Sequence, residues 1–101
     1  MSGTLVALCR FDLRIPGARS LKQKRHVVKG LTVAIRQAFP VSVAEVDHQD
    51  LWQRATLAVA AVGPDQHHLR RVMQAVGKRV DAWVEVEVID RELQLLWPDD
   101  A

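Results

Sequence analysis

The chain of 101 residues has no asparagine, no tyrosine and a single cysteine, Cys9. One cysteine cannot close an intramolecular disulfide, and its place in an apolar run indicates a small buried side chain in a reducing compartment. No apolar run approaches the roughly 18–20 residues of a membrane-spanning helix, and the start of the chain does not read as a signal peptide. We therefore expect a cytoplasmic protein with no membrane partner.

Acidic residues are almost missing from the first half of the chain. Residues 1–44 carry eight Lys/Arg and one acid, a charge of +7, whereas residues 45–101 carry six Lys/Arg and eleven Asp/Glu, a charge of −5. The net charge is only +2. This asymmetry predicts a basic patch suited to a polyanion, and the alternative is that the two halves neutralise each other across the fold.

Hydrophobic periodicity predicts one domain over residues 1–101, with four strands and two helices. The strands are expected at residues 4–15, 41–46, 54–62 and 84–97, and the helices at residues 20–39 and 65–83. Ser20 and Gln23 have the spacing of a capping box at the start of the first helix, and Pro40 ends that helix. This order of strands and helices is compatible with few folds.

The order β-α-β-β-α-β predicts an α+β ferredoxin-like fold, in which a four-stranded antiparallel sheet of order 4-1-3-2 carries both helices on one face. Half of the helix-free face is apolar and needs a cover, because large exposed apolar patches are uncommon on monomers. A second copy packed sheet against sheet is expected to provide it in a homodimer, with the C-terminal tail as the alternative. The predicted dimer face comprises Val6, Leu8, Ala58, Ala60 and Val62.

The last strand is expected to change its inward face part of the way along. Val84, Val86 and Val88 are assigned to the core face, and the apolar residues beyond them have the opposite parity, so a bulge is predicted near Asp90. Ion pairs are also expected between the first and last strands, where Arg10 and Arg14 would face Glu85 and Glu87.

The start of the first helix is a candidate anion site. Free backbone N–H groups and the helix dipole attract anions there, and nearby cations add full charges. The predicted anion- or nucleic-acid-binding residues are Arg19, Ser20, Lys22, Lys24, Arg25 and Lys29. The alternative is that Ser20 already satisfies the helix end and that the cations are simply solvated.

The turn between the two middle strands is richer in functional groups than a hairpin needs. This polar turn contains Asp47, His48, Gln49, Asp50, Trp52 and Arg54. Their spacing matches no standard metal site, so we expect neither a metal nor a cofactor. A network is favoured, in which an aspartate accepts from Arg54 or from a backbone N–H and Trp52 packs as a lid on the helix end. No residue is assigned a catalytic role.

Two functions of proteins with this fold fit the sequence poorly. Acylphosphatases bind phosphate on the first loop but also use an asparagine, and this chain has none. RNA-recognition motifs stack bases on aromatic residues of the first and third strands. The third predicted strand has no aromatic residue, and Phe11 in the first is assigned to the core. The usual binding of RNA on the sheet face is therefore excluded.

Two segments resemble the YlxP-like family of small bacterial proteins. Residues 15–25, IPGARSLKQKR, resemble the family segment IPG-(A/S)-x-SLK-x-KR, and residues 43–55, VAEVDHQDLWQRA, look like its second signature. The resemblance implies a ferredoxin-like domain of unknown function whose genes often lie beside those for translation initiation and ribosome maturation. It implies a role linked to RNA or the ribosome and supplies no catalytic residues.

Three functional hypotheses follow from the sequence. The first is a cytoplasmic RNA- or ribosome-associated accessory factor that binds anions at the first-helix start, with the polar turn adding specific contacts. The second is a homodimeric protein-interaction module that binds no nucleic acid. The third is an enzyme that acts on a small anionic substrate through Asp47, His48 or Asp50.

Overall fold

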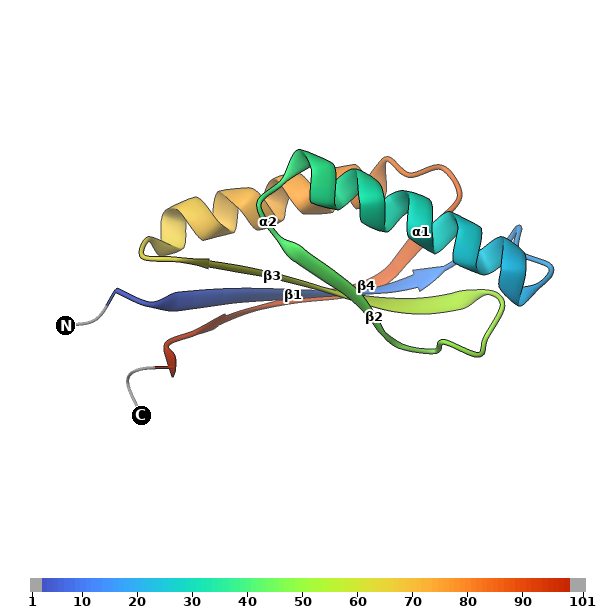
Figure 1. Cartoon of the computed structure of the whole chain (residues 1–101), viewed down its shortest axis with the longest axis horizontal. Coiled ribbons are helices and arrows are strands. Elements are labelled where there is room, and N and C mark those ends of the chain that lie inside the picture. The colour runs from blue at the N-terminus through green and yellow to red at the C-terminus, as the bar shows by residue number, and fades with distance from the viewer. Residues whose placement is uncertain (1–2, 99–101) are drawn as a thin grey trace.

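Six elements follow one another in the order β-α-β-β-α-β in the computed structural model, which describes residues 3–98. They are β1 (Leu5–Arg14), α1 (Leu21–Ala38), β2 (Ser42–Asp47), β3 (Arg54–Gly63), α2 (Gln66–Asp81) and β4 (Glu87–Leu96). The strands form one antiparallel sheet in the order β2-β3-β1-β4, and both helices lie on the same face of it (Figure 1). This confirms the predicted ferredoxin-like fold, because the order 4-1-3-2 is the same order read from the other edge.

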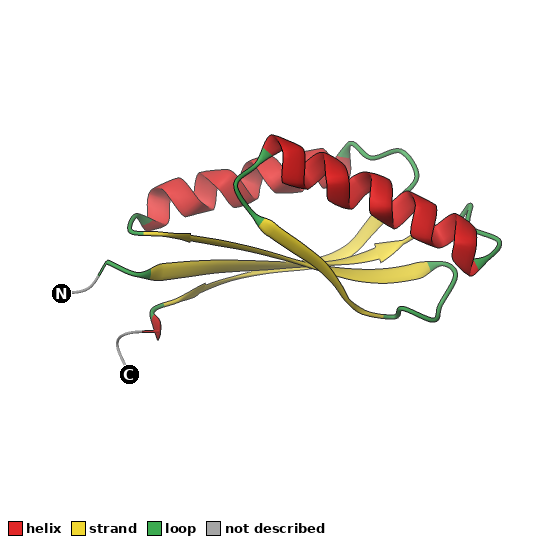
Figure 2. Cartoon of the chain, in the orientation of Figure 1, coloured by secondary structure: helices red, strands yellow, loops and turns green. Residues whose placement is uncertain are grey.

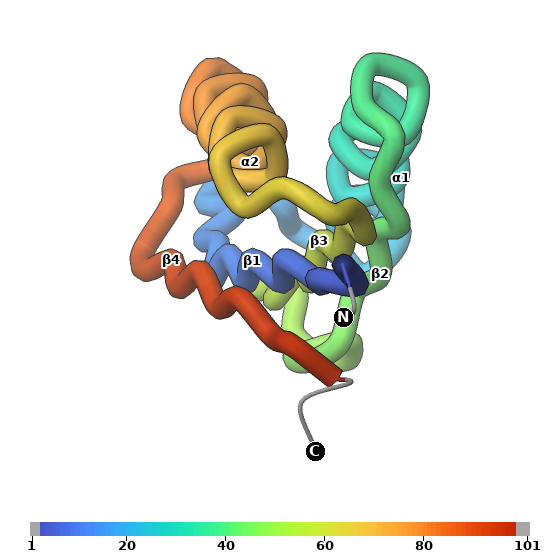
Figure 3. Tube along the Cα trace, turned by 90° about the vertical axis from the view of Figure 1, so that its left-hand side faces the viewer, coloured from blue at the N-terminus to red at the C-terminus, as the bar shows by residue number. Residues whose placement is uncertain are grey.

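The core lies between the sheet and the helix layer, which are drawn in yellow and red in Figure 2. The residues of β1 alternate between the two faces of the sheet. Those that face the helices are at most 5% exposed, and those between them are half-buried or exposed. Phe11 of β1 pairs with Leu57 of β3 across the two central strands, and both are fully buried. Seen end-on, α1 lies toward β2 and α2 toward β4 (Figure 3).

The loop between β1 and α1 and the turn between β2 and β3 lie together at the end of the molecule away from both termini (Figure 1). At that end Ser20 Oγ accepts from the Gln23 N–H at 3.1 Å, and Gln23 Oε1 accepts from the Arg19 N–H at 2.6 Å. These reciprocal bonds confirm the predicted capping box, although the glutamine reaches one residue further back than the usual partner. Both helix and turn are therefore fixed at this end.

The last strand differs from the prediction at its start. Strand β4 begins at Glu87, and a turn in which the Val86 N–H donates to the Trp83 carbonyl at 3.1 Å separates it from α2. Val84 lies in this turn and is 98% exposed, so its assignment to the core face is wrong. The pairing then passes from Asp12–Asp90 to Leu13–Val88, which confirms the bulge predicted near Asp90.

Only one of the ion pairs predicted between the first and last strands is formed. Arg14 Nη1 lies 3.4 Å from Glu87 Oε2, on the exposed surface. Arg10 is opposite Glu92 in the sheet register, and Glu85 precedes the strand. The expectation that Arg10 and Glu85 take part in these ion pairs is wrong, because the α2–β4 turn includes residues that were counted into the strand.

The predicted dimer face lies together on the helix-free face of the sheet. The pairs across β1 and β3 are Val6–Val62, Leu8–Ala60 and Arg10–Ala58, and paired residues share a face. Val62 is 71% exposed, and Leu96 of β4, which pairs with Val6, is 44% exposed. An apolar surface therefore stands open on this face at the end that holds the termini.

Candidate functional site

Lys24 joins the start of α1 to the polar turn. Its Nζ donates to the carbonyl oxygens of His48 at 2.8 Å and Gln49 at 3.1 Å. The same atom lies 2.6 Å from Glu45 Oε2 in an ion pair, although the carboxylate oxygen is not aligned as a hydrogen-bond acceptor. The Lys24 side chain is 0% exposed, so its prediction as an anion-binding surface cation is wrong. It belongs to the buried face of α1, together with Val28 and Leu31.

Gln53 makes a second connection between the same two segments. Its Nε2 donates to the carbonyl oxygens of Pro16 at 3.3 Å and Ala18 at 3.1 Å, and its own carbonyl accepts from the Ile15 N–H at 2.9 Å. Gln53 was not among the predicted site residues. Its place inside the second family-like segment is the only sequence signal that could have found it. The two segments are therefore in direct contact at one end of the fold.

The polar turn takes its shape from an unusual backbone conformation at His48. This residue has a φ of 62°, in the left-handed region that glycine and asparagine occupy more readily. The Asp47 side chain accepts from the His48 N–H at 2.7 Å, as the predicted network required of one aspartate. The His48 carbonyl accepts from the Leu51 N–H at 3.1 Å and from Lys24. The turn thereby aims its carbonyl oxygens inward at the ammonium group.

The outer side of the turn is more open than predicted. Trp52 is 53% exposed and Leu51 is 48% exposed, so the expectation that Trp52 packs as a lid on the helix end is wrong. Arg54 is half-buried, and its Nε makes no hydrogen bond within residues 3–98. Neither Asp47 nor Asp50 forms an ion pair with it in the part of the chain that the structure describes. The polar turn therefore presents an exposed indole to solvent.

Four exposed cations surround the start of α1, and we call them the basic helix start. They are Arg19, Lys22, Arg25 and Lys29. Among residues 3–98 the ion pairs are Arg14–Glu87, Lys24–Glu45 and Arg91–Asp81, so no member of the basic helix start is neutralised by contact. The N–H groups of Leu21 and Lys22 make no hydrogen bond within the described chain. Positive charge and free donors are thus concentrated on one surface.

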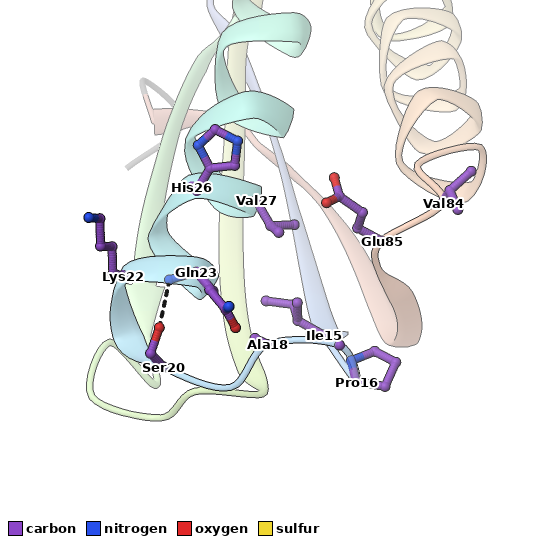
Figure 4. A pocket seen from close by; sticks show the side chains of 11 residues that line it. Ile15, Pro16, Ala18, Ser20, Lys22, Gln23, His26, Val27, Val84 and Glu85 are labelled. Carbon is purple, nitrogen blue, oxygen red and sulfur yellow. Dashed lines mark hydrogen bonds between the residues drawn. The ribbon is translucent and has the colours of Figure 1, made fainter.

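A groove of about 800 Å³ opens on the other side of the same helix start, between α1 and the α2–β4 turn (Figure 4). It is lined by Ile15, Pro16, Gly17, Ala18, Ser20, Lys22, Gln23, His26, Val27, Val84 and Glu85. The aspartates and the histidine of the polar turn are not part of it, so no substrate in the groove would meet them. Sequence reasoning missed this groove because its second wall comes from a turn that was assigned to a strand.

The remaining chemistry of the described residues is sparse. Residues 3–98 contain no group of three or more His, Cys, Asp or Glu placed to hold a metal ion. Burial raises the pKa of the Cys9 thiol, and the nearby Arg91 charge opposes this only in part. No helix in the described part of the chain combines the length and apolar character needed to cross a membrane.

Comparison with known proteins gives a family match. A family model described as a protein of unknown function, DUF503, matches residues 6–93. The uncharacterized protein YlxP of Bacillus subtilis (strain 168) is 31% identical over 83 residues, which are 82% of this chain and 90% of that protein. These matches span both segments that resembled the YlxP-like family.

Of two similar solved structures of low sequence identity, one has a TM-score above 0.5 and shares the fold. A C-terminal segment of the alpha subunit of aIF2 from Pyrococcus abyssi is similar with a TM-score of 0.51 and 14% identity, over 92% of this chain and 49% of that chain. SnoaB, a cofactor-independent oxygenase from Streptomyces nogalater, is similar with a TM-score of 0.49 and 12% identity, over 95% of this chain and 93% of that chain. At such identities the likeness concerns the backbone alone.

Proposed function

We propose that this chain, which belongs to the DUF503 family of proteins of unknown function, is an RNA-binding accessory factor of the ribosome. The basic helix start would be its phosphate-binding surface. One observation carries the proposal: four exposed cations line a single helix start, and none of them is neutralised by an ion pair within residues 3–98. A helix N-terminus adds the favourable end of its dipole to these charges.

The arrangement of the cations favours a polyanion over a solvated surface. Lys22 and Arg25 are three residues apart, and Arg25 and Lys29 are four residues apart, so like charges are neighbours on the helix. Each such pair destabilises a helix by a few tenths of a kcal/mol, roughly, unless a counter-charge is bound. A phosphate backbone would supply that counter-charge repeatedly, at a spacing that a single small anion does not match.

The polar turn supports the same proposal, because it is held against the helix start. Lys24 and Gln53 fix its position, while Trp52 presents more than half of its surface to solvent. Stacking of an unpaired base on an aromatic side chain stabilises RNA complexes by roughly 1–3 kcal/mol. His48, Gln49 and Arg54 would then be the neighbouring polar contacts. The phosphate contacts would then provide most of the affinity for RNA, and the polar turn would provide the preference among RNA sequences.

Charge reversal at the basic helix start, compared with charge reversal on α2, tests the proposal. The triple variant Arg19→Glu, Lys22→Glu, Arg25→Glu should lose cosedimentation with ribosomal subunits and binding to RNA fragments at about 50 mM salt. Its salt slope for single-stranded RNA should fall by about 2, since each phosphate contact contributes about 0.7. The matched control is Arg70→Glu, Arg71→Glu, Lys78→Glu on α2, which changes three exposed and unpaired cations by the same charge. Equal losses in both triples, or no binding by the unmodified protein, would overturn the proposal.

A second candidate function is a homodimer formed through the helix-free sheet face. The exposure of Val62 and Leu96 beside Val6 favours it, because these residues form one apolar surface on the sheet. In sedimentation velocity at high micromolar concentration, the protein should run as a dimer and Val62→Asp as a monomer. Val84→Asp is the control, since it changes another exposed valine, in the α2–β4 turn and away from the sheet face. A monomeric unmodified protein would remove this candidate.

A further inference from the structure

The groove beside the start of α1 uses a part of the chain that phosphate binding does not explain. Its floor is Ile15 to Ala18, the Ile-Pro-Gly-Ala stretch of the first family-like segment. None of these residues is charged, so the basic helix start has no need of them. Ile15 and Ala18 are at most 2% exposed, and Val27 of α1 adds a third apolar contact. The stretch therefore shapes a cavity wall.

The form of the groove suits a flat ring with a polar edge. Its volume of about 800 Å³ lies within the range of roughly 300–1,000 Å³ that holds small ligands. Val84 lines it from the α2–β4 turn and is 98% exposed. In Figure 4 the side chains of Ile15 and Val27 point into the space that Val84 and Glu85 face from the other side. An apolar ring face would cover the exposed Pro16 and Val84, since Ile15 and Val27 are already at most 8% exposed.

The groove has five polar lining side chains, of which Glu85 lies on the α2–β4 turn and the others lie at the start of α1: Ser20, Lys22, Gln23 and His26. Gln23 Oε1 already accepts from the Arg19 N–H, so only its Nε2 is free, and that atom can only donate. Glu85 makes no ion pair or hydrogen bond within residues 3–98, and its carboxylate can only accept. The groove thus offers the two acceptor oxygens of a carboxylate on one wall and, on the other, donors that include the Gln23 amide and the Lys22 ammonium group.

Guanine is the base that matches this pattern. Its N1–H and N2–H₂ groups are adjacent donors that one carboxylate can accept together, and its O6 and N7 accept from an amide donor. Cytosine, adenine and uracil each present one donor group on the same edge. Ser20 and Lys22 line the groove and also belong to the helix start, so a backbone held there continues directly into it.

We infer that the groove holds one unpaired guanine of the bound RNA, read by Glu85 and Gln23 over the exposed Pro16 and Gly17. This inference rests on the proposed function, because the phosphates that flank the guanine would be held by the basic helix start. It assigns to the Ile-Pro-Gly-Ala stretch the task of receiving a base. The bound guanine would also supply hydrogen-bond donors to Glu85, which has no ion pair within residues 3–98.

Fluorescence anisotropy with labelled RNA octamers tests the inference. The probes are oligouridine and the same octamer with one central guanine, adenine or cytosine, at about 50 mM salt. A single guanine should raise the affinity about tenfold, and adenine or cytosine should change it less than threefold, since one bidentate pair discriminates at about that level. In Glu85→Gln the guanine preference should disappear while binding of oligouridine persists. Glu92→Gln is the matched control, because it removes the same charge from an exposed glutamate that has no ion pair within residues 3–98 and lies outside the groove.

The outcomes separate this inference from the proposed function. Equal affinity for the four octamers, together with the salt slope expected of the basic helix start, would overturn the guanine site and leave RNA binding in place. A guanine preference that survives in Glu85→Gln would overturn it as well. Loss of all binding to octamers and ribosomal subunits would remove both. Loss of preference in Glu85→Gln alone supports the site.

Discussion

At the scale of single residues, Lys24 shows how a charged side chain becomes part of a core. Three oxygen atoms of β2 and the polar turn surround its ammonium group, and no part of the side chain reaches solvent. Removing one partner of a buried ion pair is costly, because the other charge is then left without compensation. Lys24 is thus a positioning residue for the turn, whereas its neighbours on α1 are free to meet a ligand.

Replacement of Lys24 by methionine should lower the free energy of unfolding by about 3 kcal/mol. The value lies at the low end of the usual range because the Glu45 side chain keeps 19% exposure. Urea denaturation measures it, and the midpoint should fall without a change in the slope. The double variant Lys24→Met, Glu45→Gln should recover part of the loss, since no unpaired charge remains.

Lys29→Met is the control for that series, because Lys29 is an exposed lysine on the same helix without an ion pair in the described residues. Its effect should stay within about 0.5 kcal/mol, as for other surface substitutions. If Lys24→Met were as mild as Lys29→Met, the buried network would not stabilise the turn.

At the scale of elements, the first turn of α1 has two roles that one substitution can separate. Ser20 caps the helix through the Gln23 N–H, and it also lines the surface where phosphate is proposed to bind. Aspartate caps a helix as well as serine does, and its charge favours the helix N-terminus. The same charge would repel a phosphate.

Ser20→Asp should therefore keep or raise the free energy of unfolding, by roughly 0.3–1 kcal/mol, while RNA affinity falls. Ser20→Ala should do the reverse, with a loss of about 1 kcal/mol in stability and little change in affinity at temperatures where it is folded. Thermal unfolding and RNA anisotropy on the same samples give both values. Unchanged RNA affinity in Ser20→Asp would show that phosphate does not pass the helix end.

Most elements were predictable because their signals are local. Alternation defined β1, a continuous apolar run defined β3, the Ser20–Gln23 spacing defined the start of α1, and a change of parity gave the bulge in β4. The α2–β4 turn was not predictable in the same way, because three valines at alternate positions look like a strand whether or not they pair. Its exposed Val84 and unpaired Glu85 were therefore counted into the sheet.

The site was predicted less completely than the elements, for two physical reasons. Lys24 was assigned to the surface because lysine is rarely buried without a partner, and its partners lie on another element. Its spacing of four and seven residues from Val28 and Leu31 was a helical signal of the inward face. The left-handed backbone of His48 could not be predicted from the sequence, because a histidine adopts a positive φ only occasionally.

At the scale of the whole molecule, the single thiol reports on the integrity of the core. Cys9 lies in the central strand β1, is 5% exposed and has a raised pKa because of burial. Reaction with a thiol reagent needs a thiolate at the surface, so it requires the core to open. Few local motions expose a central strand of a four-stranded sheet.

Labelling of native Cys9 by an aromatic disulfide should be slower than in the unfolded chain by a factor of about 10³ or more, given a stability of at least about 5 kcal/mol. Stability should also decline as the pH rises above the ordinary thiol value of 9.0, because only the unfolded chain then loses the proton. Labelling kinetics and circular dichroism at increasing urea should give the same opening free energy. Fast labelling in the absence of denaturant would contradict the buried position.

The contact between Lys24 and the polar turn has a consequence for the order in which the chain folds. The hairpin of β2 and β3 is local, but the group that orients its tip lies 24 residues earlier in the sequence, on a helix. The strands can pair before α1 docks, whereas the carbonyl groups of His48 and Gln49 gain their ammonium partner only afterwards. The tip of the hairpin should therefore be among the last parts to reach its native geometry, and Trp52, which lies on it, is placed to record the docking of the helix as a late kinetic phase.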